Sequence, residues 1–145
     1  MERVLVRKLQ KGDASQIGRI DAAITKAHQR TDFKRLVEEV VEKETAASFV
    51  AEAKGKVVAY MISYVTLGSF GTDRCAWIAM FGVDPRYMDQ GIGKKLAEEI
   101  FAFHKNNGIK VVYTSVRWDS TDILSFCKTL GFERSEFLHL KRSLH

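Results

Sequence analysis

The feature that most constrains this chain is an apolar segment that leads through a glycine-rich corner into a helix. Residues 77–83 are almost continuously apolar, and the run ends just before Pro85, the only proline in the chain. This pattern predicts a buried strand. The corner reads Gly91-Ile92-Gly93-Lys94. After it, apolar side chains recur on one face at a helical spacing, at Ile92, Leu96, Ile100 and Phe103. The segment therefore predicts strand, turn and helix in succession.

The corner has the properties of an anion site. A glycine-rich loop that opens a helix leaves several N–H groups unpaired, and the helix dipole adds partial positive charge. Phosphate or pyrophosphate is the usual occupant. We expect Lys94 to serve this anion, whereas for Lys95 a solvated surface is equally open. The P-loop and dinucleotide patterns do not fit, because Met88 and Leu96 stand where those patterns need small residues.

Length and composition predict one soluble domain over residues 1–145. No run of about 18 apolar residues predicts a membrane span, and the charged first residues do not resemble a signal peptide. Cys75 and Cys127 lie far apart without metal spacing, so we expect no metal and free thiols in a reduced, cytoplasmic protein. The net charge of +5 comes without a basic block rich in aromatics. We therefore expect neither nucleic acid nor membrane as a partner, and a homodimer stays open.

Hydrophobic periodicity predicts an α/β (α+β) fold, in which helices flank a single mixed, mostly antiparallel sheet. Asp13 or Ser15 is expected to cap the first helix, and Thr31 or Asp32 the second. The expected order is β-α-α-β-β-β-α-β-α-β. Its strands are 4–9, 48–52, 56–67, 77–83, 111–118 and a closing strand around 137–140, and its helices are 13–24, 33–41, 92–106 and 120–130.

One phrase in the sequence resembles a known family signature. Val83-Asp84-Pro85-x-Tyr87-x-x-x-Gly91-Ile92-Gly93-Lys94-x-Leu96 is similar to the acetyl-CoA signature of the GNAT N-acetyltransferase superfamily. The opening residues 4–13 and the late turn Leu130-Gly131-Phe132 also look like that family. The resemblance covers nearly the whole chain and implies the same order of elements.

The resemblance implies acetyl-CoA as co-substrate. In this family the strand before the glycine-rich loop pairs with the pantetheine arm, which carries over onto Phe81 and Val83. The N–H groups of the loop hold the pyrophosphate, and a side chain at either glycine would block its approach. This role carries over onto Met88, Asp89, Gln90, Gly91, Gly93 and Lys94. The sequence departs from the family at two of these positions, since Met88 replaces the usual Arg or Gln and Asp89 a frequent Gly.

The reaction implied is direct attack of a neutral primary amine on the thioester within a ternary complex. Members that acetylate protein N-termini often carry a Glu base, an Asn and a Tyr acid where this chain has Ser115, Ser120 and Cys127. Cys127, and with it Ser120, is a candidate catalytic residue, because a thiol can donate a proton to the CoA sulfur. The alternative is that Cys127 is a small core residue. The base is then water, or a side chain from elsewhere: Asp119, Glu136 or His139.

Several questions stay open at this level. The acceptor is a protein N-terminus, a lysine or a small amine. Trp77, Trp118, Tyr60 and Tyr64 either line its pocket or belong to the core, the more usual place for aromatics on strands. His28 and His104 are expected on helix surfaces. Two other functions compete: a catalytically weak acyl-CoA-binding sensor or regulatory module, and a binder of nucleotide phosphates.

Overall fold

The computed structural model describes residues 3–25, 32–42, 47–68 and 73–145. The chain forms two compact units, residues 1–115 and residues 116–145, and each is described by itself. The described part of the first unit holds five strands and three α-helices, and the second unit holds one α-helix. None of the described helices is both long and apolar enough to cross a bilayer.

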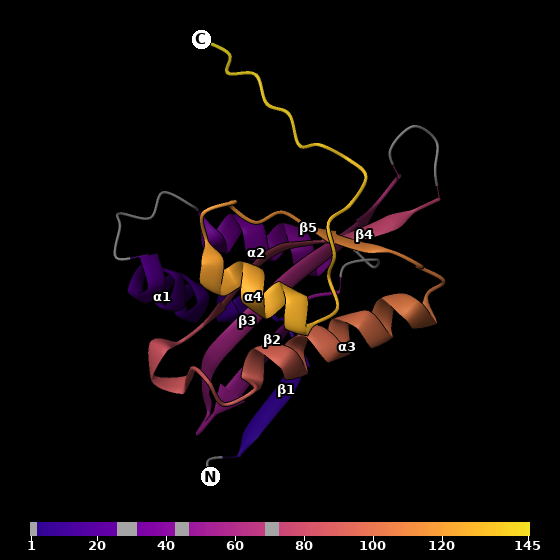
Figure 1. Ribbon diagram of the computed structural model, residues 1–145. Coiled ribbons are helices and arrows are strands. Elements are labelled where there is room, and N and C mark those ends of the chain that lie inside the picture. Colours follow the sequence, from indigo (N-terminus) through magenta and orange to yellow (C-terminus); the bar gives the residue numbers. More distant parts are fainter. Residues whose placement is uncertain (1–2, 26–31, 43–46, 69–72) are drawn as a thin grey trace. The chain divides into compact units, whose positions relative to one another are not determined.

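The first unit follows the predicted order closely (Figure 1). Its strands are β1 (Val4–Lys8), β2 (Phe49–Ala53), β3 (Lys56–Thr66), β4 (Cys75–Val83) and β5 (Val112–Thr114). Its α-helices are α1 (Ala14–Thr25), α2 (Phe33–Glu42) and α3 (Ile92–Asn106), and two 3-10 turns, η1 (Lys11–Asp13) and η3 (Pro85–Tyr87), precede α1 and α3.

The five strands form one sheet in the order β1-β2-β3-β4-β5. The first three pairings are antiparallel, and β5 joins β4 in parallel, which confirms the predicted mixed, mostly antiparallel sheet. The strand predicted over 111–118 is shorter than expected, because only Val112–Thr114 pair with β4. β5 therefore pairs with only part of β4, and the rest of this edge of β4 is left open at the candidate site.

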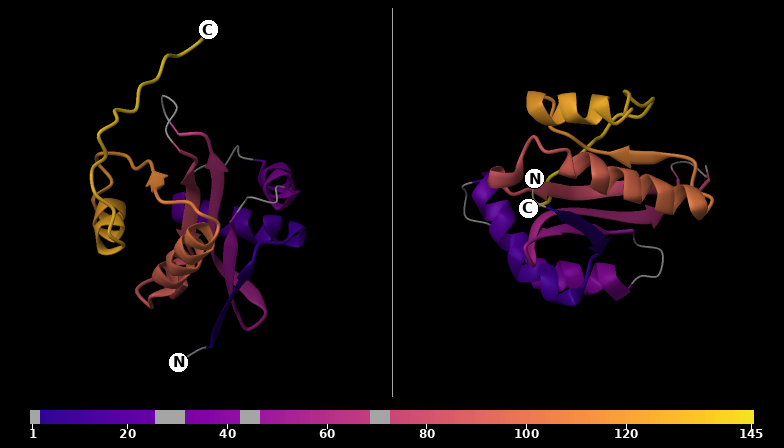
Figure 2. Two further views of the ribbon diagram at one scale, coloured as in Figure 1. Left: turned by 90° about the vertical axis from the view of Figure 1, so that its right-hand side faces the viewer. Right: turned by 90° about the horizontal axis from the view of Figure 1, so that it is seen from below.

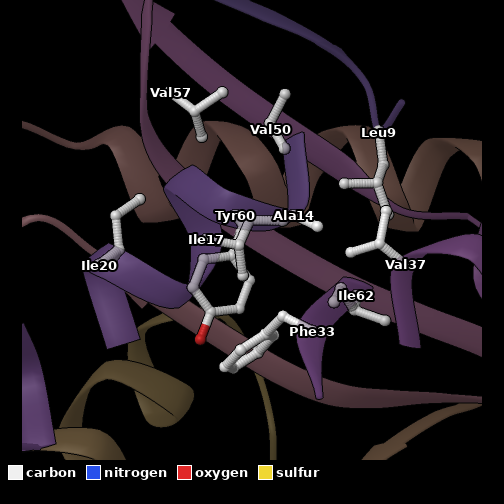
Figure 3. Close-up of a cluster of buried hydrophobic side chains, with 10 residues drawn as sticks. All are labelled: Leu9, Ala14, Ile17, Ile20, Phe33, Val37, Val50, Val57, Tyr60 and Ile62. Carbon is white, nitrogen blue, oxygen red and sulfur yellow. The ribbon is translucent and has the colours of Figure 1, made fainter. Parts of the chain in front are cut away.

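Helices cover both faces of this sheet. Figure 2 shows α1 and α2 on one side of the strands and α3 on the other. The core under α1 and α2 is drawn in Figure 3, where Ile17 and Ile20 of α1 and Phe33 and Val37 of α2 meet Tyr60 and other residues of β2 and β3. On the α3 side, the predicted apolar face is buried, with Ile92, Leu96 and Ile100 each at most 2% exposed.

Polar contacts set where α1 and α2 begin. Asp13 is buried, but its carboxylate accepts hydrogen bonds from the Gln10 N–H and from both terminal nitrogens of Arg7, at 2.8 to 2.9 Å. It thus anchors the turn before α1 to β1. Asp32 caps α2, because its Oδ1 accepts the Arg35 N–H at 3.1 Å. Thr31, the other candidate cap, lies outside the described residues.

The second unit contains α4 (Thr121–Thr129) and a terminal segment. The helix ends just before Gly131, close to the predicted position, and the Phe132 N–H donates to the Cys127 carbonyl at 3.0 Å. The closing strand predicted around 137–140 is absent, although residues 132–145 are all described. Leu138 and Leu140 are 80% and 85% exposed. A short apolar pattern becomes a strand only where a neighbouring strand completes its hydrogen bonds, and this one forms no such pairing.

Candidate functional site

The candidate site begins where β5 stops following β4. β5 pairs with β4 only at Ala76, Trp77 and Ile78. On the other side, β3 pairs with β4 from Cys75 to Val83, apart from one register shift. Among the described residues, no strand lies along Ala79–Val83 on the side away from β3. We call this stretch the open edge of β4. Such an edge offers main-chain groups to an extended ligand.

The direction of the main-chain groups at this edge follows from one hydrogen bond. The Asp84 N–H donates to the Val58 carbonyl of β3 at 2.8 Å. Because successive N–H groups along a strand point to opposite sides, Val83 directs its N–H away from β3, and so does Phe81. These are the two residues onto which the family resemblance places the pantetheine arm.

A β-bulge marks the start of the open edge. Ile78 pairs with Ser63 and Met80 pairs with Ile62, so that Ala79 has no register partner in β3. A bulge bends its strand and increases the local twist. The bulge thus coincides with the point where β4 and β5 separate, because Ile78 and Thr114 form the last pair between them.

The glycine-rich corner follows the open edge directly. Asp84 starts η3 by accepting the Arg86 N–H at 2.9 Å, and hydrogen bonds from Arg86 lower the pKa of the Asp84 carboxyl. Gly91 is the N-cap of α3, with φ of 77°, and no side chain caps the helix. The first turn of α3 contains no acidic residue. Its N–H groups are therefore left for an anion, as the sequence predicts.

The corner also has room for such a ligand. A Cβ built on Gly91 would meet no heavy atom within 4 Å. The surrounding predicted residues are solvent-exposed side chains of the same loop and first turn: Met88, Asp89, Gln90 and Lys94. Asp89 has φ of 62°, an unusual value for a residue with a side chain. Together with Gly93, the structure thus places all six predicted pyrophosphate residues on one continuous stretch after the open edge.

The two candidate catalytic residues lie in the second unit. Cys127 is 6% exposed, and burial raises the pKa of its thiol above the ordinary value. It is therefore the neutral S–H form that prevails near neutral pH. Ser120 precedes α4, where its carbonyl accepts the Leu124 N–H at 3.0 Å, and its hydroxyl does not cap the helix. A buried, protonated thiol is compatible with both roles expected for Cys127, proton donor and core residue.

The alternative bases differ in their surroundings. Asp119 is held by Arg117, whose Nε and Nη2 each donate to one carboxylate oxygen at 3.0 Å. These hydrogen bonds lower the pKa of Asp119, so this carboxylate is a weaker base than an ordinary one. Glu136 and His139 are exposed in the terminal segment. Ser115, at the family's Glu position, is exposed just after β5.

The aromatic candidates divide between core and surface. Tyr60 is 1% exposed and donates its hydroxyl to Asp21 of α1 at 3.2 Å, so it is a core residue. Trp118, in the second unit, is 86% exposed. Trp77 and Tyr64 are only partly buried. The sequence analysis missed Tyr113 of β5, whose ring stacks on Trp77, because only strand register brings the two together.

The expected surface position of His104 is wrong. This residue is 1% exposed, and its Nε2 lies 2.9 Å from the Ser63 hydroxyl of β3. Burial lowers the pKa of the imidazole. His104 lies four residues after the buried Ile100, on the apolar face of α3. This spacing indicates burial. His28 lies outside the described residues.

Comparisons with known proteins identify the family and the fold. The acetyltransferase (GNAT) family matches residues 15–132. A mycothiol acetyltransferase of Amycolatopsis mediterranei is 30% identical over 91 residues, which are 61% of this chain and 30% of that protein. The N-alpha-acetyltransferase RimI of Mycobacterium tuberculosis is 40% identical over 53 residues, 37% of this chain and 32% of that protein. The match thus spans about a third of each relative. A solved aminoglycoside N-acetyltransferase in complex with CoA shares the fold, with a TM-score of 0.84 at 17% identity over 99% of this chain and 96% of that one.

Proposed function

The chain belongs to the acetyltransferase (GNAT) family, and on this basis we propose that it is an acetyl-CoA-dependent N-acetyltransferase. It moves an acetyl group from acetyl-CoA to a primary amine by direct attack in a ternary complex. The observation that carries this proposal is the continuity of the open edge of β4 with the uncapped N-terminus of α3. In acetyl-CoA an extended pantetheine arm is joined to a diphosphate. These two parts match the open edge of β4 and the N-terminus of α3 in the same order.

The proposed binding roles follow from main-chain geometry. Val83 and Phe81 pair with the amide-bearing pantetheine arm, because their main-chain groups point to the open edge. The diphosphate lies against the loop and first turn of α3, where N–H groups and the helix dipole favour negative charge. Lys94 adds a positive side chain there. The residues proposed for the diphosphate are Met88, Asp89, Gln90, Gly91, Gly93 and Lys94.

Acetyl-CoA supplies an activated acetyl group, and the protein has to manage two protons. An alkyl ammonium with a pKa of about 10.4 must lose a proton before its nitrogen can attack. The nitrogen then forms the new C–N bond while the C–S bond breaks, and the departing thiolate needs a proton. We propose Cys127 as its donor, since burial keeps this thiol protonated, with Ser120 as a second candidate. The proposed base is water or an exposed side chain of the terminal segment, Glu136 or His139, because Asp119 is engaged by Arg117.

We propose further that residues 1–145 act as one acetyltransferase domain. Acetylation of protein N-termini and of small molecules both occur among similar proteins, since one relative is named as an N-alpha-acetyltransferase and one similar structure as an aminoglycoside N-acetyltransferase. The acceptor proposed here is therefore a primary amine, as a protein N-terminus, a lysine or a small molecule. A reduced, cytoplasmic setting fits the free thiols of Cys75 and Cys127, both of which are buried.

Binding of acetyl-CoA tests the proposal, with a matched pair of glycine variants. Gly91 and Gly55 have the same φ of 77°, and neither has a heavy atom within 4 Å of an added Cβ. Gly91→Val and Gly55→Val therefore impose similar backbone strain, but only the first fills the corner. Calorimetric titration should show that Gly91→Val weakens acetyl-CoA binding by about tenfold or more, as expected for loss of one or two charge-assisted hydrogen bonds. Equal affinities in the two variants would contradict the proposal.

One observation favours a second candidate function. The usual Glu, Asn and Tyr positions hold Ser115, Ser120 and Cys127, and Asp119 is bound by Arg117. A domain without a strong base suits an acyl-CoA-binding sensor or regulatory module with weak turnover. Release of free CoA thiol, measured with a panel of amines, separates the two. Tight acetyl-CoA binding without release of CoA thiol on any amine would favour the module. Preferential binding of ATP would contradict both functions.

A further inference from the structure

Three aromatic side chains form a row across the sheet, outside the proposed cofactor site. Tyr64 of β3 is the register partner of Trp77 of β4, which in turn is the register partner of Tyr113 of β5. Residues directly opposite each other in a sheet project to the same face. The rings of Trp77 and Tyr113 stack, with centroids 5.3 Å apart and planes 28° apart. We call Tyr64, Trp77 and Tyr113 the aromatic row.

The row lies on the sheet face that α1 and α2 cover elsewhere. Ile62 belongs to the core beneath these two helices, and Tyr64 lies two residues further along β3, on the same face. Ser63, between them, projects to the other face, where its hydroxyl meets His104 of α3. The aromatic row is therefore on the opposite face of the sheet from α3, the helix that begins at the proposed diphosphate corner.

The row residues are more exposed than the core residues beside them on this face. The core cluster beneath α1 and α2 contains Tyr60 and Ile62 of β3 but none of the three row residues. Tyr64 is 38% exposed, and Trp77 and Tyr113 are partly exposed. Aromatic rings that remain accessible on a sheet, next to a candidate site, are suited to contact a ligand.

The aromatic row also ends where the open edge of β4 begins. Trp77 immediately precedes Ile78, the last residue of β4 that pairs with β5, and the open edge starts at Ala79. If the proposed function holds, the thiol-bearing arm follows this edge from Val83 towards Ala79. A molecule seated on the aromatic row then approaches the thioester from the face opposite α3. The arm then occupies the strand edge and the other molecule the sheet face, so the two do not compete for the same space.

We propose that the aromatic row is the acceptor platform, and that the acceptor is a primary amine carried on a ring with an apolar face. This inference rests on the proposed function. Aromatic side chains recognise flat or apolar ring faces by stacking and edge contacts. The row holds no carboxylate, and neither does the next register pair towards the sheet end, Thr66 and Cys75. These five residues therefore do not offer the ion pairs that a linear polyamine would need.

Fluorescence tests the platform without requiring turnover. The chain has two tryptophans, Trp77 and Trp118, so Trp118→Phe leaves the row with the only tryptophan signal. This variant is titrated with 2-phenylethylamine, glucosamine and 1,4-diaminobutane. We expect a saturable change of Trp77 emission with one or both ring amines, and binding of the linear diamine at least about tenfold weaker. No saturable change with either ring amine would overturn the proposal, as would equal or tighter binding of the linear diamine.

Kinetic measurements on variants of Tyr64, at one end of the aromatic row, provide the second test. Tyr64→Leu removes the most exposed ring, whereas Tyr64→Phe keeps it. With the better ring amine, Tyr64→Leu should raise KM about five- to tenfold and leave kcat and acetyl-CoA affinity unchanged, the scale expected for one aromatic contact. Tyr64→Phe should retain the parent KM. An unchanged KM in Tyr64→Leu would contradict the platform. Failure to bind acetyl-CoA would instead refute the proposed function, while the Trp77 titration still decides the row.

Discussion

The two halves of β4 have similar sequences but different surroundings. Ala76–Ile78 lie between β3 and β5, so neighbouring strands accompany both edges of β4 there. Ala79–Val83 are equally apolar, yet only β3 accompanies them. One strand therefore pairs on both sides over its first half and leaves one edge open over its second half. The comparison teaches that the function of a strand depends on where its neighbour ends.

The structural reason for the difference is the length of β5 together with the bulge at Ala79. β5 contains three residues, so its pairing with β4 ends at Ile78 and Thr114. The bulge adds twist to β4 at the same level. A longer β5 would continue the parallel ladder and close the edge. The short strand is therefore as important for the proposed site as the glycine-rich corner itself.

The largest expected difference between the halves comes from proline substitutions. Ala76 donates its N–H to the Val111 carbonyl at 3.1 Å and is fully buried. Ala76→Pro removes this hydrogen bond within the sheet and should lower the free energy of unfolding by about 3 kcal/mol or more. Val83→Pro removes an N–H that points to the open edge, so it should cost about 1 kcal/mol or less. Urea denaturation followed by circular dichroism measures both.

Of the two proline variants, Val83→Pro is expected to be the more stable, yet it should lose affinity for acetyl-CoA. Val83→Pro should weaken binding about three- to tenfold, because one main-chain hydrogen bond is lost. If Val83→Pro unfolded the protein as severely as Ala76→Pro, the assignment of the open edge would be wrong.

The next largest effect concerns packing behind the open edge. A Cβ at Gly82 would lie 2.9 Å from Cε1 of Tyr60 and from Cδ1 of Ile24, closer than real contacts allow. Gly82→Ala should therefore lower the free energy of unfolding by about 1–3 kcal/mol. Gly12→Ala is the control, because its Cβ meets nothing within 4 Å. Thermal denaturation of both variants gives the comparison, and equal melting temperatures would show that β4 approaches Tyr60 less closely than described.

A smaller effect is the pH dependence of stability that arises at one end of α3. The first turn faces the open corner, whereas His104 in the last turn is buried beside Ser63 of β3. Burial lowers the pKa of His104 below its ordinary 6.5. The unfolded chain then takes up the proton first as the pH falls, so this contribution to stability is complete above the ordinary pKa and is lost on acidification.

Denaturation between about pH 7 and pH 5 measures this loss. His104→Asn should flatten the profile in that range, and substitution of the exposed His139 by Asn should leave it unchanged. A profile that stays equally steep in His104→Asn would assign the acid sensitivity to another group.

Most of the fold could be predicted from local patterns. The apolar spacing of Ile92, Leu96 and Ile100 located α3, and Asp32 was correctly expected to cap α2. The predictions failed where a partner decides the outcome. Residues 137–140 have an apolar pattern but form no strand, and His104 is buried because β3 provides Ser63. The helical spacing from Ile100 indicates burial of His104, but Ser63 as its partner and the lack of a neighbouring strand for residues 137–140 become visible only with the topology.

The candidate site was predictable to a similar extent. The glycine-rich corner showed itself through Gly91, whose left-handed backbone and uncapped helix the structure contains. The residues of β4 do not by themselves reveal the open edge, since they are apolar throughout and only the length of β5 divides them. Only the family resemblance implied that Phe81 and Val83 pair with a ligand. The aromatic row was found only in part, because Tyr113 joins Trp77 through register. The roles of Cys127 and Ser120 stay predictions.

Amide hydrogen exchange at Val83, followed by NMR with and without acetyl-CoA, tests the central claim most directly. The open edge predicts that the Val83 amide exchanges readily in the free protein and becomes protected when acetyl-CoA binds, whereas the Ala76 amide, already bonded within the sheet, is protected in both states. A Val83 amide whose exchange does not change at saturating acetyl-CoA would contradict the account.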